Sequence, residues 1–126
     1  MATANWRGTV GVVKPTYGSG SLVEFIRLLP EGVGVIPVYA GIKEHSEKGY
    51  LDALESYHQR VAELAKLGVD LMHPEGAPPF MVRSYVEEDL EVPVVHPVAA
   101  RVWYVQKKMR IRQPVPGAGR LLAELP

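Results

Sequence analysis

The chain contains no cysteine, which excludes disulfide bonds, thiolate nucleophiles and cysteine metal ligands together. The absence also fits a reducing compartment. Neither sign of charge is in excess, because 14 basic and 14 acidic residues give a formal net charge of zero. No overall electrostatic attraction to nucleic acid or to a membrane surface is therefore expected. No apolar run approaches the roughly 20 residues of a membrane span, and no charged start followed by an apolar run indicates a signal peptide. We expect a cytoplasmic protein without nucleic-acid or membrane partners.

The composition that remains is typical of one soluble domain. With 126 residues, 47% of them hydrophobic, the chain is long enough to bury a core as a single domain, residues 1–126. Its 12 glycines and 11 prolines lie between apolar segments, where they indicate turns rather than a low-complexity tract.

Short β-branched segments alternate with segments of helical periodicity along the chain. Buried strands are predicted at Thr9–Val13, Val33–Val38, Val69–Met72 and Val92–Val95. Helices are predicted from Gly18–Ser21 to Pro30, at Glu47–Leu67, at Pro78–Leu90, from Pro97 to about Met109, and at Gly119–Leu125. This order predicts an α/β fold, a flavodoxin-like three-layer domain with about four parallel strands. Pro93 favours an edge position for the last of these strands.

The segment Glu47–Leu67 has the clearest helical pattern. Its apolar residues recur at three- and four-residue steps and define one face: Leu51, Leu54, Tyr57, Val61, Leu64 and Ala65. Gly68 follows, where a left-handed helix cap is needed.

Polar residues follow each predicted strand at its carboxyl end, the edge of a parallel sheet where ligands bind. His73 and Glu75 follow the third strand, and His96 follows the fourth. These three are the candidate catalytic residues. Glu75 can take or give a proton if burial raises its pKa. The alternative is a polar turn with Glu75 in solvent. A metal site of two histidines and one carboxylate is less favoured than hydrogen-bonded or helix-capping histidines, because the spacing is not diagnostic.

Candidate binding residues lie in the same loops. They are Thr16, Tyr17, Tyr39, Gly76 and Ala77. The glycine-rich turn after Tyr17 opens a helix, whose unpaired N–H groups suit a carboxylate or phosphate. The alternative there is an ordinary helix cap, and for Tyr39 a core aromatic with a solvated hydroxyl.

Three stretches of the chain carry a resemblance to a known family. They are GTVGVVKPT near the start, LAKLGVDLMHPEGAPPF in the middle, and VPVVHPVAARVWYVQ followed by VPGAGRLL. Together they resemble the aspartate/glutamate racemase superfamily, especially the branch of arylmalonate decarboxylases and maleate cis–trans isomerases. The likeness covers most of the chain, and the order of the motifs carries it. It implies a small carboxylic acid as substrate and names no cofactor.

Two departures separate the chain from that family. Full members are about twice as long and hold their active site between two similar α/β halves, whereas this chain matches one half. A complete site would then form within one domain or between identical chains. A homo-oligomer is expected, because a small sheet without its partner domain should expose an apolar face. Racemases of this type also use two cysteines, and Gly76 or a neighbour stands where the first is expected. Thiol-based racemisation is therefore excluded, and a loop whose N–H groups hold a carboxylate remains.

Two functions stay open. The first is an enzyme that isomerises or decarboxylates a small carboxylic acid, with Glu75, His73 or His96 handling protons in place of cysteine. The second is a non-catalytic ligand-binding or assembly protein derived from the same fold.

The segment Arg101–Arg120 is basic, and Trp103 and Tyr104 lie within it. Nucleic-acid binding is conceivable, but the neutral chain disfavours it. We expect instead that Val102, Val105 and Met109 face the core while the charged residues face solvent.

Overall fold

The computed structural model describes residues 5–16, 21–44, 46–75 and 82–126; of residue 50 and residues 82–85 only the backbone is described. In chain order the elements are β1 (Gly8–Lys14), α1 (Ser21–Leu28), β2 (Val33–Tyr39), α2 (Glu47–Asp52), α3 (Leu54–Lys66), β3 (Leu71–Pro74), the π-helix η1 (Val82–Asp89), α5 (Pro97–Met109) and α6 (Arg120–Glu124). The predicted α/β class is confirmed.

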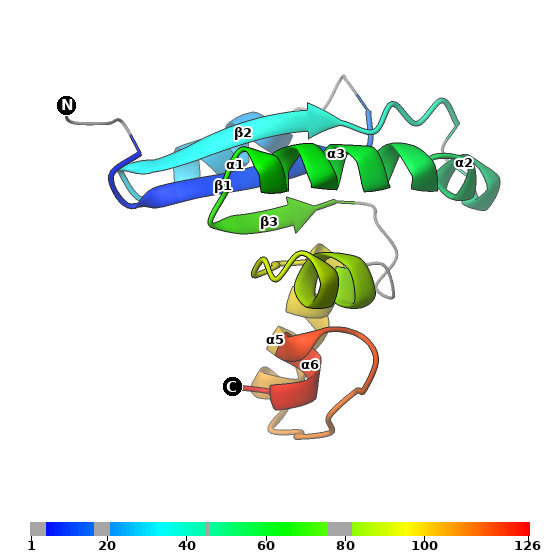
Figure 1. The fold of residues 1–126 in the computed structure, drawn as a ribbon. Helices are drawn as coiled ribbons and strands as arrows, with labels where there is room; N and C mark the ends of the chain where they lie inside the picture. The colour runs from blue at the N-terminus through cyan, green and yellow to red at the C-terminus, as the bar shows by residue number, and fades with distance from the viewer. Residues whose placement is uncertain (1–4, 17–20, 45, 76–81) are drawn as a thin grey trace.

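The sheet is parallel and its strand order is β2-β1-β3 (Figure 1). The described chain has three strands rather than four. The segment predicted as the fourth strand makes one isolated parallel bridge, between Met72 and Val94, beyond β3. The extended segment is short because Glu91, before it, has a left-handed φ of 55° and His96, after it, caps the next helix. The bridge lies at the sheet edge, the position that Pro93 favours.

Strand alternation sends side chains to two faces of this sheet. Val13 and Met72 point to the α3 face, where they pack with Tyr57, Val61 and Leu64 in the main core. The intervening residues of β1 and β3 point to the α1 face. Figure 1 shows α3 in front of the sheet and α1 behind it. Helices therefore cover both faces.

Strand boundaries differ from the predicted ones by one or two residues. β1 extends through Lys14 and β2 through Tyr39. β3 spans Leu71–Pro74, two residues later than predicted at each end, and at Asp70 the side-chain carboxylate accepts a hydrogen bond from Thr9 N at 2.8 Å. Lys14, Tyr39 and His73 consequently lie inside strands and not after them.

The helix predicted at Glu47–Leu67 is interrupted. The chain turns at Ala53, which is buried, and the Ala53 carbonyl accepts the first α3 hydrogen bond from Tyr57 N at 3.0 Å. The turn rotates α2 away from the core, so Leu51 is 53% exposed and the prediction for this residue is wrong. Gly68 does follow α3 with a left-handed φ, as predicted.

α5 and α6 form a second, smaller cluster at the carboxyl end of the chain. α5 has its predicted bounds, with Pro97 in its first turn, and α6 matches the predicted Gly119–Leu125 helix to within one residue at each end. Ala99, Leu122 and Leu125 form the buried centre of the cluster. The prediction that Val102, Val105 and Met109 face the core is wrong, because all three are exposed.

The helix predicted at Pro78–Leu90 is described only from residue 82, as η1; residues 78–81 lie outside the described chain. None of the helices in the described part is both long and apolar enough to cross a membrane.

Candidate functional site

Lys14, the last residue of β1, is the centre of the candidate site. It shares the α1 face with Val12, two residues earlier, and it is buried. Its Nζ donates to Ser21 Oγ, the first residue of α1, at 2.7 Å, and forms an ion pair with the Glu75 carboxylate. This lysine joins the ends of β1 and β3 to the start of α1.

Glu75 directly follows β3, and its backbone is held from two sides. The Glu75 N–H donates to the Val13 carbonyl at 3.0 Å, and the Tyr57 hydroxyl of α3 donates to the Glu75 carbonyl at 2.8 Å. The Glu75 side chain is 32% exposed, so its carboxylate meets both Lys14 and solvent. A fixed backbone with a partly solvated carboxylate suits proton exchange.

His73 lies in β3 opposite Val12 of β1, and its ring stacks on Phe25 of α1 with centroids 5.3 Å apart. Burial lowers the pKa of His73 below 6.5; Glu75 opposes this shift, while the Lys14 charge and His96 add to it. Its Nδ1 is buried and makes no hydrogen bond within the described chain. His73 is therefore a neutral imidazole at neutral pH.

These side chains line one cavity of about 240 Å³ at the carboxyl edge of the sheet. Its polar groups come from Lys14, Ser21, His73 and Glu75, and its apolar walls from Val12, Leu22, Phe25 and Pro97. A small organic anion with an apolar part fits this lining, because the cation is buried and most of the wall is hydrocarbon.

The structure brings two of the eight predicted site residues together. His73 and Glu75 come together in the cavity. His96 is buried nearby but caps α5, where its Nδ1 accepts from Val98 N at 3.3 Å. Thr16 is half-buried after β1, and Tyr39 lies opposite Lys14 in the sheet, but neither lines the cavity. Tyr17, Gly76 and Ala77 lie outside the described residues. Across the described ranges, no group of three histidine or acidic residues is arranged to hold a metal ion.

Lys14 was not among the residues predicted for the site, and Ser21 was predicted only as part of the turn that opens a helix. The signal for Lys14 was present, since Val10, Val12 and Lys14 alternate onto one face of a strand that contains almost only apolar residues. A lysine that continues a buried face needs an anionic partner. Nothing in the sequence identified Glu75, 61 residues later, as that partner.

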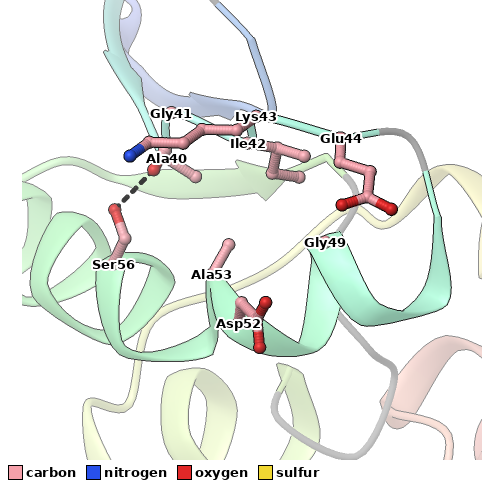
Figure 2. Close-up of a pocket in the computed structure, with 9 residues that line it drawn as sticks. All are labelled: Ala40, Gly41, Ile42, Lys43, Glu44, Gly49, Asp52, Ala53 and Ser56. Atoms are coloured by element: carbon pink, nitrogen blue, oxygen red, sulfur yellow. Dashed lines mark hydrogen bonds between the residues drawn. The ribbon is translucent and has the colours of Figure 1, made fainter.

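A second cavity, of about 410 Å³, lies beyond the end of β2, between the loop after Tyr39 and helices α2 and α3 (Figure 2). The Ser56 hydroxyl donates a hydrogen bond across this cavity to the Ala40 carbonyl at 2.7 Å. Its charged residues, Lys43, Glu44 and Asp52, are exposed. Although it is larger, it lacks the buried charge and the neutral imidazole of the first cavity, which we take as the candidate site.

The fold and the cavity define the chain as a small α/β protein with a ligand-sized site at the carboxyl edge of a parallel sheet. No family model matches the sequence, and no curated protein matches it.

Proposed function

We propose that the Lys14 cavity binds a small carboxylic acid and catalyses a carbanion reaction on it, an isomerisation or a decarboxylation. The observation that carries the proposal is the convergence of Lys14, His73 and Glu75 in one cavity at the carboxyl edge. The sequence resemblance to the racemase superfamily points to the same substrate class.

Substrate binding rests on Lys14 and Ser21. The Lys14 ammonium attracts the substrate carboxylate, and the Ser21 hydroxyl, 2.7 Å from Nζ, offers a further hydrogen bond. The substrate carboxylate shares Lys14 with Glu75, whose side chain can turn toward solvent. One cation among apolar walls favours an acid with a single anchored carboxylate and an apolar substituent.

Proton transfer rests on His73 and Glu75. In isomerisation, neutral His73 takes a proton from the carbon next to the carboxylate, and the electron pair remains on the substrate as an enolate beside Lys14. The proton then returns at the new position. In decarboxylation, the carbon–carbon bond breaks instead and CO2 leaves, and the carbanion takes up a proton that comes from water and is relayed through Glu75 or His73. His96 caps α5 and does not line the cavity, so it takes no direct part in the proton transfer.

For the fold we propose the flavodoxin-like, half-racemase architecture. The strand order β2-β1-β3 with Val94 bridged beyond β3 supports it, because this is the order of the first four strands of that fold.

We also propose assembly with a second copy over α1. This helix, as the structure describes it, has no buried residue, and Val23, Ile26 and Leu28 are exposed. Because α1 forms one wall of the cavity, a second copy there would shield the site from water. Light scattering that shows a strict monomer at all concentrations would refute this assembly.

Turnover of malonates, maleate and amino acids by the purified chain tests the enzyme. We expect activity that Glu75→Gln and His73→Asn each reduce by at least about 100-fold, the range for a lost acid or base. Glu63→Gln, an exposed carboxylate on α3, is the matched control and should keep full activity. Circular dichroism establishes that each variant is folded. Unchanged activity in Glu75→Gln shows that Glu75 has no catalytic role.

The alternative is a binding protein without catalysis. Its support is that Glu75 already neutralises Lys14, which makes the pair stable without substrate. A thermal-shift screen with the same acids separates the two, because binding without turnover identifies the non-catalytic protein.

A further inference from the structure

α5 exposes a narrow apolar stripe that the proposed function does not use. Its residues are Val98, Val102, Val105 and Met109, with exposed fractions of 49%, 36%, 52% and 65%. They are spaced by four, three and four residues, the spacing of the a and d positions of a coiled-coil helix. The side of α5 that packs against α6 is a different one, formed by Ala99 and Trp103.

The residues along one side of this stripe are basic. Arg101 and Lys108 occupy the positions directly beside it on that side, Lys107 lies on the opposite face of α5, and Arg110 and Arg112 follow the end of the helix. No acidic residue occurs between Pro97 and Gly119. All five basic residues are exposed. The surface therefore combines an apolar seam with one basic flank, whereas the other flank holds Ala99 and Gln106, next to α6.

We propose that this α5 surface docks an acidic amphipathic helix of a partner protein. The seam spacing matches what a second helix contacts when it packs lengthwise, and valines are suited to the a and d positions. Acidic residues beside the partner's own seam would pair with Arg101 and Lys108, in the way that oppositely charged flanks select coiled-coil partners.

A second copy of α5 fits this surface less well. In a parallel pair the basic carboxyl-terminal ends of the two helices lie side by side. In an antiparallel pair Arg101 of one helix lies beside Lys108 of the other. Either arrangement opposes like charges, which is destabilising.

An anionic bilayer also fits less well. Helices that lie in a membrane interface insert a broad face rich in leucine and aromatic residues. The α5 stripe is narrow and consists of valine and methionine. Trp103 is turned inward, where its Nε1 donates to the Pro126 carbonyl at 2.8 Å.

Two synthetic helical peptides test the proposal. Both carry leucine at a and d, but one carries glutamate and the other lysine at the flanking e and g positions. Fluorescence anisotropy measures binding of each peptide to the full chain at about 0.05 and 0.15 M salt. We expect the acidic peptide to bind at least about 10-fold more tightly than the basic one, and less tightly at the higher salt.

Three variants sharpen the result. Val105→Glu should weaken binding of the acidic peptide at least about 10-fold, since it places a charge in the seam. Arg101→Glu/Lys108→Glu should reverse the preference between the two peptides. Leu67→Glu, an exposed apolar residue at the end of α3, is the control and should leave binding unchanged.

Three outcomes overturn the proposal: equal binding of both peptides, no binding of either, or an effect of Leu67→Glu as large as that of Val105→Glu. It is also overturned if the chain binds vesicles of phosphatidylserine and phosphatidylcholine and Val105→Glu abolishes this while neither peptide binds. Sedimentation that shows self-association, abolished by Val105→Glu, would identify a second copy as the occupant and likewise overturn it.

Discussion

Lys14 and Glu75 form one ion pair, yet water reaches its two members very differently. The lysine side chain is 3% exposed and the glutamate side chain is 32% exposed. Without its carboxylate, the buried ammonium keeps Ser21 Oγ as its one hydrogen-bond partner in the described part of the chain, whereas a carboxylate without its lysine turns into solvent. Removal of Glu75 should therefore lower the free energy of unfolding more than removal of Lys14.

A double-mutant cycle measures this asymmetry. We expect Glu75→Gln to lower the free energy of unfolding by about 3 kcal/mol, because it leaves the Lys14 charge buried. Lys14→Met should cost only about 1 kcal/mol, because Glu75 can be solvated and the methionine fills the cavity wall. The double variant should be no less stable than Glu75→Gln alone. Urea denaturation of the four proteins gives the values, and equal costs for the two single variants would contradict the argument.

His73 makes stability depend on pH. Its pKa is lowered in the folded chain, chiefly by burial, so below pH 6.5 the unfolded chain binds a proton that the folded chain resists. The contribution of His73 to the free energy of unfolding is therefore complete above pH 6.5. It decreases as the pH falls below this value toward the pKa of the folded chain, by at most about 1.4 kcal/mol per pH unit.

His73→Phe isolates this effect. Phenylalanine can keep the ring stack on Phe25 but binds no proton, so the variant should become more stable relative to the native chain as the pH drops from about 7.5 to 5. Urea denaturation across this range measures the difference. Between about pH 7.5 and 8.5 the difference should stay constant, since neither state of His73 titrates there. A constant difference at all pH values would mean that His73 titrates alike in both states.

At the scale of the secondary-structure elements, glycine is required at two positions near the connection from α3 to the sheet, for different reasons. Gly11 of β1 lies under α3, and a Cβ there would be 2.9 Å from Leu64 Cδ1 and 3.2 Å from Val69 Cγ1. Gly68, after α3, has open space around it but a φ of 75°. The first glycine is required by packing and the second by backbone conformation.

Alanine at each position separates the two causes. Gly11→Ala should cost about 2 kcal/mol through overpacking, because Leu64 is fully buried and cannot move aside. Gly68→Ala should cost about 1 kcal/mol through its left-handed conformation, and Gly68→Asn less. Adding Leu64→Val should offset part of the Gly11→Ala loss and none of the Gly68→Ala loss. If Leu64→Val behaves alike in both backgrounds, steric crowding is not the cause at Gly11.

Periodicity predicted the elements well where a segment buries one face. The α/β class, the bounds of α5 and the cap at Gly68 all followed from local pattern, because each depends on a few neighbouring residues. The break at Ala53 did not follow, since the apolar pattern continues across it. Nor did the exposure of Val102, because a periodic stripe indicates that a helix has an apolar face but not what covers it.

The candidate site was likewise predictable only in part. Placement of His73 and Glu75 at one edge followed from parallel strand ends. The Lys14–Glu75 pair required tertiary register, which sets residue 14 of β1 next to the end of β3 and which no local pattern contains.

At the scale of the whole molecule, two apolar clusters are separate. Among the residues that the structure describes, the main core joins the sheet to α3 with ten buried residues, whereas the α5–α6 cluster has three: Ala99, Leu122 and Leu125. Between them, the Arg120 N–H donates to the Glu87 carboxylate at 3.3 Å. So small a buried centre indicates that α5 and α6 open at lower free energy than the sheet.

Leu122→Ala tests this difference in local stability. It removes the centre of the small cluster, so amide hydrogen exchange should accelerate in α5 and α6 while the amides of Val12 and Val13 in β1 keep their protection. Val61→Ala, in the main core, should accelerate exchange throughout the chain, because opening the sheet unfolds everything that packs on it. Equal acceleration of β1 in both variants would mean that the two clusters unfold as one cooperative unit. The α5 surface would then be as rigid as the sheet, and a docked helix would gain nothing by ordering it.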